Sequence, residues 1–499
     1  MTSMRSLPHE ERDSAAMKAV TLVAVVVATA TAAFSGTMAG SNSKLAVILP
    51  MTALVGLAVG VLALTRFKVY VMVMLIMRSS IDLAKLSVGG EGGGGRTAAD
   101  QVAARGIDPS SVLGLLFIVA AVVWLTAQYR KHGRLPGSPL RRTLVVFAAA
   151  CVLSIVGAGQ PLVSIQETLR ILAVILMYVV LEQMMMKDER AMRQLLFAVY
   201  LSLLFPLAFT AFGFITGNPS TEEKGEFIRI TGPFLQSNSF GRYLMLMIIF
   251  GVAIHPHLDK RFRRPLAGAL ALSSVFLLLT YTRTAIIGAV LGLLVVGLIQ
   301  SKRLLFGMIA FSVCALLVVP QLSSRFTGLS ESSSSSSGPT NNSLIWRLGY
   351  WAEVLPLAKS NPVTGIGLAM TARQTEEEKQ PHNDFLRAYV ETGLIGLGAY
   401  VAMLISLVTL ARRAVRASPR HSFERGVGAG LLGCAVAFIA GSVSANMISN
   451  VVTLWYLFAF AAAASAVVER QRRQAQVEVA GPFGVERPGR AASAADIVI

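Results

Sequence analysis

The chain has 499 residues, of which 54% are hydrophobic and only 14% charged, and its mean hydropathy is +0.62. This composition excludes a soluble domain of such length and predicts a polytopic membrane protein, because apolar runs of about 17 residues or more recur along the chain. The formal net charge is +18. The basic residues cluster in short segments between apolar runs, as the positive-inside rule requires, and this argues against a nucleic-acid partner.

About fourteen apolar runs follow one another, so the predicted fold is all-α, with about 12–14 transmembrane helices and one large outward-facing loop. The third run is the weakest, because Arg78 and Asp82 interrupt it. The predicted spans are residues 19–35, 45–65, 69–87, 111–127, 143–159, 165–186, 194–216, 240–256, 265–281, 284–301, 304–321, 386–410, 427–444 and 451–469.

The hydrophilic segments divide the chain into five parts. A tail at 1–18 precedes spans with short loops at 19–321. A large outward loop at 322–385 follows, and then come the last spans at 386–469 and a tail at 470–499. Both tails are predicted to be cytoplasmic, because they lie on the side of the basic loops.

Alternate loops differ in charge, which assigns each loop to one side of the membrane. The basic set, predicted to be cytoplasmic, comprises the segments around 66–68, 130–142, 187–193, 260–264, 302–303 and 412–425. The other set, predicted to face outward, comprises 36–44, 88–110, 157–164, 217–239, 282–283, 322–385 and 445–450.

One of the six histidines, His382, is predicted to face outward. It ends the large loop directly before an apolar run. An isolated histidine at a helix start is commonly a capping or surface residue, but it is also the side chain best suited to moving a proton near neutral pH. Its surroundings decide between these two interpretations.

Outward-facing arginines oppose the positive-inside pattern and therefore call for an explanation. Arg229 lies in 217–239, Arg283 forms the turn between two apolar runs, and Arg347 lies in the large loop. Any one of them is explained by a side chain that reaches lipid headgroups. Together, on the side of His382, they favour a shared anionic ligand such as a diphosphate, because guanidinium groups bind phosphate oxygens bidentately.

Other chemistry-bearing residues give weaker signals. Neither a metal site nor a disulfide framework is predicted, because no ligand cluster has metal spacing and the three cysteines lie in apolar runs: Cys151, Cys314 and Cys434. Trp346, Tyr350 and Trp351 in the large loop are open to two interpretations, anchoring at the membrane interface and stacking on sugar rings.

The pattern around His382 resembles the signature of the O-antigen ligase and O-antigen polymerase family of bacterial membrane glycosyltransferases. In that signature a histidine and an asparagine precede nine residues and then Gly-x-x-Gly, and His382, Asn383, Gly393 and Gly396 match it. The resemblance extends over about 195–410. Its weaker elements are Thr282-Arg283-Thr284-Ala285, the run from Gly232-Pro-Phe to Asn238, and the run from Arg347 through Trp351 and Asn361-Pro362 to Gly365-Ile-Gly367.

The resemblance implies a GT-C-type architecture and a metal-independent enzyme without a cofactor. Such an enzyme transfers glycan from an undecaprenyl-diphosphate-linked donor to a glycan or lipid acceptor, on the periplasmic or extracellular face of the bacterial cytoplasmic membrane. The lipid bilayer and other polysaccharide-assembly proteins are further expected partners. Members have about ten to twelve spans, fewer than the about fourteen predicted here.

The resemblance also implies roles for individual residues. His382 would be the base that activates the acceptor hydroxyl. The diphosphate would be held by Arg229, Arg283 and Arg347. The residues that would support this site are Asn383, Asn238, Arg242, Gly393 and Gly396.

Two alternatives are left open by the sequence. A ligase to a lipid or wall acceptor would use the same donor as a polymerase, and we favour the polymerase because it presumes no particular envelope. A flippase or other transporter for lipid-linked glycan would place ionisable residues at mid-membrane in two repeated halves. Mid-span ionisable residues are expected to be few, with Arg170 as the main example, so an enzyme is favoured.

Overall fold

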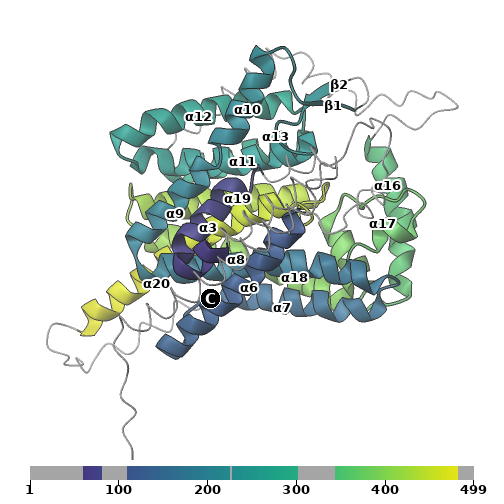
Figure 1. Cartoon of the computed structure of the whole chain (residues 1–499), viewed down its shortest axis with the longest axis horizontal. Coiled ribbons are helices and arrows are strands. Elements are labelled where there is room, and N and C mark those ends of the chain that lie inside the picture. Colours follow the sequence, from purple (N-terminus) through teal and green to yellow (C-terminus); the bar gives the residue numbers. More distant parts are fainter. Residues whose placement is uncertain (1–59, 81–108, 225–226, 302–342, 481–499) are drawn as a thin grey trace, which may run out of the picture.

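The computed structural model describes residues 60–80, 109–224, 227–301 and 343–480, which form helices and one small strand hairpin (Figure 1). The elements up to the hairpin are α3 Phe67–Met77, α6 Pro109–His132, α7 Pro139–Ser154, η1 Ile155–Gly157, α8 Pro161–Lys187, α9 Glu189–Leu201 and α10 Leu204–Ile215. The hairpin consists of β1 Thr221–Lys224 and β2 Phe227–Ile230. The later elements are α11 Ser237–Ile254, η2 His255–His257, α12 Lys260–Leu279, α13 Arg283–Gln300, α16 Ser343–Val354, η3 Leu355–Lys359, α17 Thr371–Gln374, α18 Asp384–Ala417, α19 Phe423–Ser442 and α20 Val451–Ala480.

The residues at several helix starts explain where those helices begin. Pro139 and Pro161 open α7 and α8, where a missing backbone N–H costs nothing and the fixed φ suits the first turn. Asp188 and Ser422 precede α9 and α19, and the side chain of each accepts hydrogen bonds from N–H groups of the first turn. Local sequence therefore fixes these boundaries.

Nine helical segments of the described chain are long and apolar enough to cross a membrane. They are Pro139–Gly157, Pro161–Lys187, Glu189–Ile215, Ser237–His257, Lys260–Leu279, Arg283–Gln300, Asp384–Ala417, Phe423–Ser442 and Val451–Gln476. Each overlaps one predicted span, which confirms the all-α polytopic membrane fold. The predicted spans 19–35 and 304–321 lie outside the described residues, so the total of about 12–14 stays a prediction.

The strand hairpin is the part of the fold that the all-α prediction missed. β1 and β2 pair antiparallel, with Glu222 opposite Arg229. An ion pair of 3.7 Å joins these two side chains across the strands. Two strands of four residues carry no hydrophobic period by which a sequence would reveal them. Cross-strand pairing and the buried arginine therefore define the hairpin.

The core is built around α20, α11 and α8, while α12 lies at the periphery. In α20, 89% of the apolar stretch is buried, against 22% in α12. Phe460 of α20 stacks on Phe250 of α11 with ring centroids 3.8 Å apart. Where α13 crosses α19, a Cβ on Gly292 would stand 2.8 Å from the carbonyl oxygen of Gly433, so small residues allow these two backbones to approach closely.

Polar elements gather at one end of the helices. Figure 1 shows the β1–β2 hairpin, α16 and α17 toward the right of the view, and the C-terminal part of α20 at the opposite side. Within the predicted large loop 322–385, the described part contains α16, η3 and α17. This end of the molecule holds the site described next.

Candidate active site

His382 stands at the junction between the large loop and α18, in a constrained backbone conformation. Its φ is +52°, a region that costs a non-glycine residue roughly 1–2 kcal/mol. Hydrogen bonds fix the chain on both sides of it. Trp351 Nε1 donates to the carbonyl oxygen of Pro381 at 2.6 Å, and Asn383 Oδ1 accepts from two N–H groups of the first turn of α18 at 3.0 and 3.1 Å. The cap of α18 is therefore Asn383 and not His382.

The aromatic residues of α16 hold the segment that leads to His382. Besides the bond from Trp351, Trp346 Nε1 donates to Glu377 Oε1 at 3.2 Å, and the Tyr350 hydroxyl donates to the carbonyl oxygen of Lys379. Lys379 also pairs with Glu377 at 2.8 Å. Hydrogen bonds from Lys379 and Trp346 hold the pKa of Glu377 below its usual value.

These contacts add a third role to the two that the sequence left open for the aromatics. Trp346 stacks on Tyr350 with centroids 5.2 Å apart, and its ring meets that of His382 edge-on at 6.0 Å. The ammonium of Lys379 lies over the Trp346 ring at 5.1 Å. The three aromatic side chains therefore position the histidine through the segment before it.

A break in α18 is shaped by glycines and by the loop that precedes α17. Gly393 has φ +68° and ψ −170°, and a Cβ there would stand 2.1 Å from the carbonyl oxygen of Val363. A Cβ on Gly365 would stand 2.3 Å from the carbonyl oxygen of Glu391, and the N–H of Gly367 donates to that same oxygen at 3.0 Å. The loop thus takes over backbone hydrogen bonds that the break leaves unmade.

Gly396 also serves the shape of this helix. A Cβ on Gly396 would collide with the side chain of Thr392, whose hydroxyl donates to the carbonyl oxygen of Ala388 at 2.6 Å. At 1.5 Å per residue, Gly393 and Gly396 lie about 13 and 18 Å along the helix from its start beside His382. Both glycines of the signature therefore shape α18 and do not reach the histidine.

Arg229 is buried and strongly hydrogen-bonded. Its Nε donates to the carbonyl oxygen of Thr280 at 2.8 Å, and its Nη2 donates to Asn238 Oδ1 at 2.8 Å and to Thr282 Oγ1 at 3.0 Å. Burial lowers the pKa of its guanidinium, and repulsion from Arg283 lowers it further. Asn238, which the resemblance placed in the site, is thus a partner of Arg229.

The remaining nitrogen of Arg229 faces the hairpin. Its Nη1 lies 3.7 Å from Glu222 Oε1, and the same carboxylate accepts a hydrogen bond from the Ser237 hydroxyl. Arg229 therefore ties β2 to the starts of α11 and α13. Each of its three side-chain nitrogens therefore has a partner within the protein.

Arg283 and Arg347 differ from Arg229 in their surroundings. Within the described part of the chain, neither makes a hydrogen bond or ion pair, and Nε of Arg283 is buried without a partner. Burial lowers the pKa of Arg347, and the charge of Arg283 adds to this effect. The two guanidinium groups thus lie near each other with their donors unused by described residues.

Arg242 and Asn446 connect the arginines to His382. Arg242 Nη1 donates to the backbone carbonyl of Asn446 at 2.9 Å, and Asn446 Nδ2 lies 3.3 Å from His382 Nδ1. The charges of Arg347 and Arg229 act on that of Arg242. The structure therefore brings His382 and the four predicted arginines into one cluster, although they come from segments far apart in the sequence.

Sequence reasoning missed a buried carboxylate that fixes the loop of Asn446. Asp384, the first residue of α18, has no exposed surface. Its Oδ2 accepts hydrogen bonds from the backbone N–H groups of Met447 and Ile448 at 3.1 and 3.2 Å, and from the Tyr400 hydroxyl at 3.3 Å. The loop between α19 and α20 is thus fastened to the residue that follows Asn383.

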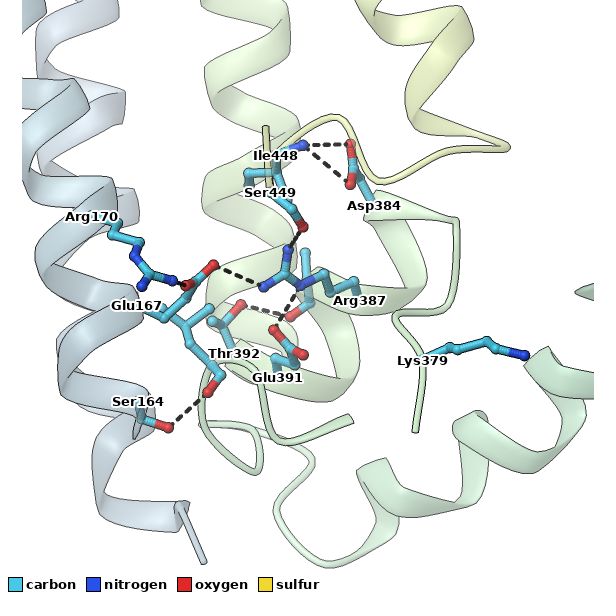
Figure 2. A network of polar contacts seen from close by, with 12 residues as sticks. Ser164, Glu167, Arg170, Lys379, Asp384, Arg387, Glu391, Thr392, Ile448 and Ser449 are labelled. Atoms are coloured by element: carbon cyan, nitrogen blue, oxygen red, sulfur yellow. Dashed lines mark hydrogen bonds and ion pairs between the residues drawn. The ribbon is translucent and has the colours of Figure 1, made fainter. Parts of the chain in front are cut away.

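Next to this contact lies a network of buried charges, drawn in Figure 2. Arg387 Nε donates to Glu391 Oε2 at 2.8 Å, its Nη2 lies 3.5 Å from Glu167 Oε1 on α8, and its Nη1 donates to the Ser449 hydroxyl. Arg170 also pairs with Glu167, at 2.9 Å. The network joins α8, α18 and the loop before α20.

Sequence reasoning did not single out three further ionisable residues, which lie among the first eight residues of α18. Asp384, Arg387 and Glu391 are all buried. Their spacing of three and four residues puts them on one face of an otherwise apolar helix. That spacing is the sequence signal that could have revealed the network.

Comparison with known proteins adds an independent observation. Residues 268–401 match the protein family described as O-antigen ligase. This segment is similar to members of that family. No curated protein matches the chain. The resemblance noted from the His382 signature is thereby confirmed.

The O-antigen ligase segment contains only part of the cluster. It runs from α12 into α18 and includes Arg283, Arg347 and His382. Arg229 and Arg242 precede it, and Asn446 follows it. The tertiary structure therefore completes the site with residues from outside the matched segment.

Proposed function

We propose that the protein is a metal-independent glycosyltransferase that acts on undecaprenyl-diphosphate-linked glycan, and that it polymerises repeat units for a surface polysaccharide. The observation that carries the proposal is the cluster of His382 with Arg229, Arg242, Arg283 and Arg347, centred on an O-antigen ligase segment. Four cations beside one another repel, and a diphosphate is a ligand that would offset this repulsion.

The chemistry requires a base and an anion-binding group. The acceptor hydroxyl oxygen forms a bond to the anomeric carbon of the donor sugar, and the bond from that carbon to the diphosphate oxygen breaks. The electron pair leaves with undecaprenyl diphosphate, and the hydroxyl proton moves to His382. Such a base contributes about 10²–10⁴-fold to the rate. Arg283 and Arg347 bind the departing diphosphate, and fixed guanidinium groups stabilise its charge without reorganising.

The proposed membrane orientation puts this chemistry on the outer face of the bacterial cytoplasmic membrane. Its support is the distribution of charge, because the basic loops lie at the other end of the helices. The bilayer and a glycan or lipid acceptor are then the remaining partners. Arginines supply the positive charge that a metal ion supplies in other transferases, so no cofactor is required.

The charged network between α8 and α18 favours one other class, a transporter of lipid-linked glycan, because ionisable groups inside membrane helices mark many transport pathways. The contacts within the network argue against it. Arg387 bonds to Glu391, Glu167 and Ser449, so the network fastens the loop that carries Asn446. We therefore retain the enzyme.

The test uses purified protein in lipid nanodiscs with undecaprenyl-diphosphate oligosaccharide as the substrate added. We expect a ladder of longer lipid-linked glycans, undiminished by EDTA. His382→Gln should reduce its formation by about 10² or more. His132→Gln, at the exposed end of α6, is the matched control and should leave the ladder unchanged.

Each outcome decides a different part of the proposal. Near-normal product from His382→Gln would contradict the role of His382. If product forms only after a second acceptor is added, the activity is that of a ligase and not of a polymerase. Loss of product in EDTA, restored by a divalent cation, would overturn metal independence.

A further inference from the structure

The contact between Asn446 and His382 raises the question of which ring nitrogen carries the proton. In the structure Asn446 Nδ2 lies 3.3 Å from His382 Nδ1. An amide nitrogen only donates, so in this arrangement Nδ1 accepts and the proton of the neutral ring is on Nε2. A neutral ring in that form could not use Nε2 as a base.

The amide of Asn446 offers the other arrangement through a half-turn about its Cβ–Cγ bond, which exchanges its oxygen and its nitrogen. Asn446 Oδ1 is buried and has no hydrogen-bond partner among the described residues. A buried amide oxygen without a partner costs about 1–3 kcal/mol. After the half-turn, Oδ1 would accept from Nδ1–H of His382, and the lone pair of the ring would be on Nε2. The amide nitrogen would then take the buried position that Oδ1 leaves.

The backbone around Asn446 is held firmly enough for such a role. Arg242 donates to its carbonyl oxygen at 2.9 Å. On the following residues, Asp384 accepts from two backbone N–H groups, and Arg387 donates to the Ser449 hydroxyl. Since Asp384 stands two residues after His382, the short stretch 382–384 at the start of α18 carries His382 and holds the loop of Asn446.

We propose that Asn446 is a positioning residue of the transfer site: its amide oxygen holds the proton on Nδ1 of His382 and makes Nε2 the basic nitrogen. The inference rests on the proposed function of His382 as the base. A second residue that fixes the ring's tautomer is a common requirement for a histidine base, because only the correct neutral form can accept the proton. Asn446 lies 64 residues from His382 in the sequence and outside the O-antigen ligase segment.

Several charged groups lie on the elements around His382. On the elements packed against it, these groups are Glu377 and Lys379 of its own segment, Arg347 of α16, Arg242 of α11, Arg283 of α13 and Asp384 of α18. Cations outnumber carboxylates here. A new carboxylate at position 446 would therefore act directly on the ring and stabilise its protonated form.

The experiment compares three variants in the transfer assay across pH. Asn446→Asp keeps an oxygen acceptor, so we expect transfer within about tenfold of the wild type, with the acidic limb of the pH–rate profile moved to higher pH by about one unit. Asn446→Leu has no acceptor and should lose about 10² in rate. Asn450→Asp is the matched control, because Asn450 lies in the same loop and its Oδ1 accepts from Thr453 N–H. It should change neither quantity.

A second measurement does not depend on transfer. In protein labelled with ¹⁵N-histidine, the resonances of His382 are those that disappear in His382→Gln. We expect the neutral ring to carry its proton on Nδ1 in the wild type and in Asn446→Asp, and to shift toward the other tautomer in Asn446→Leu. The tautomer can be measured in every folded variant, whether or not that variant is active in transfer.

The two measurements separate the two hypotheses. A proton on Nε2 of the neutral wild-type ring would overturn the inference, as would an Asn446→Asp variant as inactive as Asn446→Leu. An active His382→Gln would instead contradict the proposed function, while the tautomer measurement would still decide the role of Asn446. Loss of transfer in His382→Gln alone, with Asn446→Leu fully active, would leave the proposed function standing and reject the inference.

Discussion

At the scale of single residues, the four arginines of the cluster are not equivalent. Arg229 uses Nε and Nη2 on Thr280, Asn238 and Thr282, so much of its bonding capacity serves the structure. Arg283 makes no such bonds to the described residues, and its Nε is buried without a partner. Its guanidinium is therefore the better placed to bind a diphosphate in bidentate fashion.

Arg283→Lys keeps the charge and removes the planar pair of donors. We expect kcat/KM for the lipid-linked donor to fall about tenfold or more, because bidentate geometry is lost. Arg413→Lys is the control. Its side chain is exposed on the C-terminal half of α18, and it should leave kcat/KM unchanged. Wild-type kinetics in the Arg283→Lys variant would show that Arg283 forms the turn but does not bind the diphosphate in bidentate fashion.

At the scale of elements, α18 is the support of the site. Asn383 caps its first turn, and Asp384 holds the loop of Asn446. Arg387 joins α18 to α8. Further along, the break at Gly393 makes room for the loop around Val363. The helix therefore holds three other parts of the chain in place: the loop of Asn446, α8 and the loop around Val363.

Gly393→Ala should damage this support. Its φ of +68° and the 2.1 Å approach to the carbonyl oxygen of Val363 leave no place for a Cβ, so we expect a loss of about 3 kcal/mol or more. The measurement is the midpoint of thermal unfolding in detergent, together with the yield of folded protein. Gly398→Ala, on the same helix with open space around it, is the control and should unfold at the wild-type temperature. Equal midpoints for both variants would show that the break is not needed.

At the scale of the whole molecule, the two ends of the helices have different chemistry. At the end opposite the arginine cluster, the basic loops contact one another. Arg470 lies 3.6 Å from Glu189, and the guanidinium of Arg193 lies over the ring of Phe423. The separation of the two ends agrees with the alternation of charge along the chain.

Orientation in the membrane can be tested by labelling introduced cysteines. In a cysteine-free background, Glu376→Cys lies on the exposed segment before His382, and Arg420→Cys lies in the exposed loop before α19. An impermeant maleimide added to intact spheroplasts should label only Glu376→Cys, because the basic loops are expected to be cytoplasmic. After lysis it should label both. Labelling of Arg420→Cys alone before lysis would reverse the proposed orientation.

The helices were predictable because long apolar runs leave few other structures available in a membrane. The predicted span 386–410 falls inside α18. The predicted span 265–281 overlaps α12 except at its own last two residues, 280–281. The β1–β2 hairpin was missed, because four-residue strands give no period and depend on the ion pair between Glu222 and Arg229. The kink at Gly393 was likewise hidden within one apolar run.

The sequence by itself determined that the chain spans a membrane and that residues 268–401 match the O-antigen ligase family, because hydropathy and short motifs are local properties. It also predicted a histidine and arginines as candidates for the site. Only the tertiary structure decided how these residues meet. Asn446 carries no local signal, and it reaches His382 because Asp384 and Arg387 hold its loop. Contacts of this kind depend on the packing of segments distant in the chain, and a linear pattern cannot contain them.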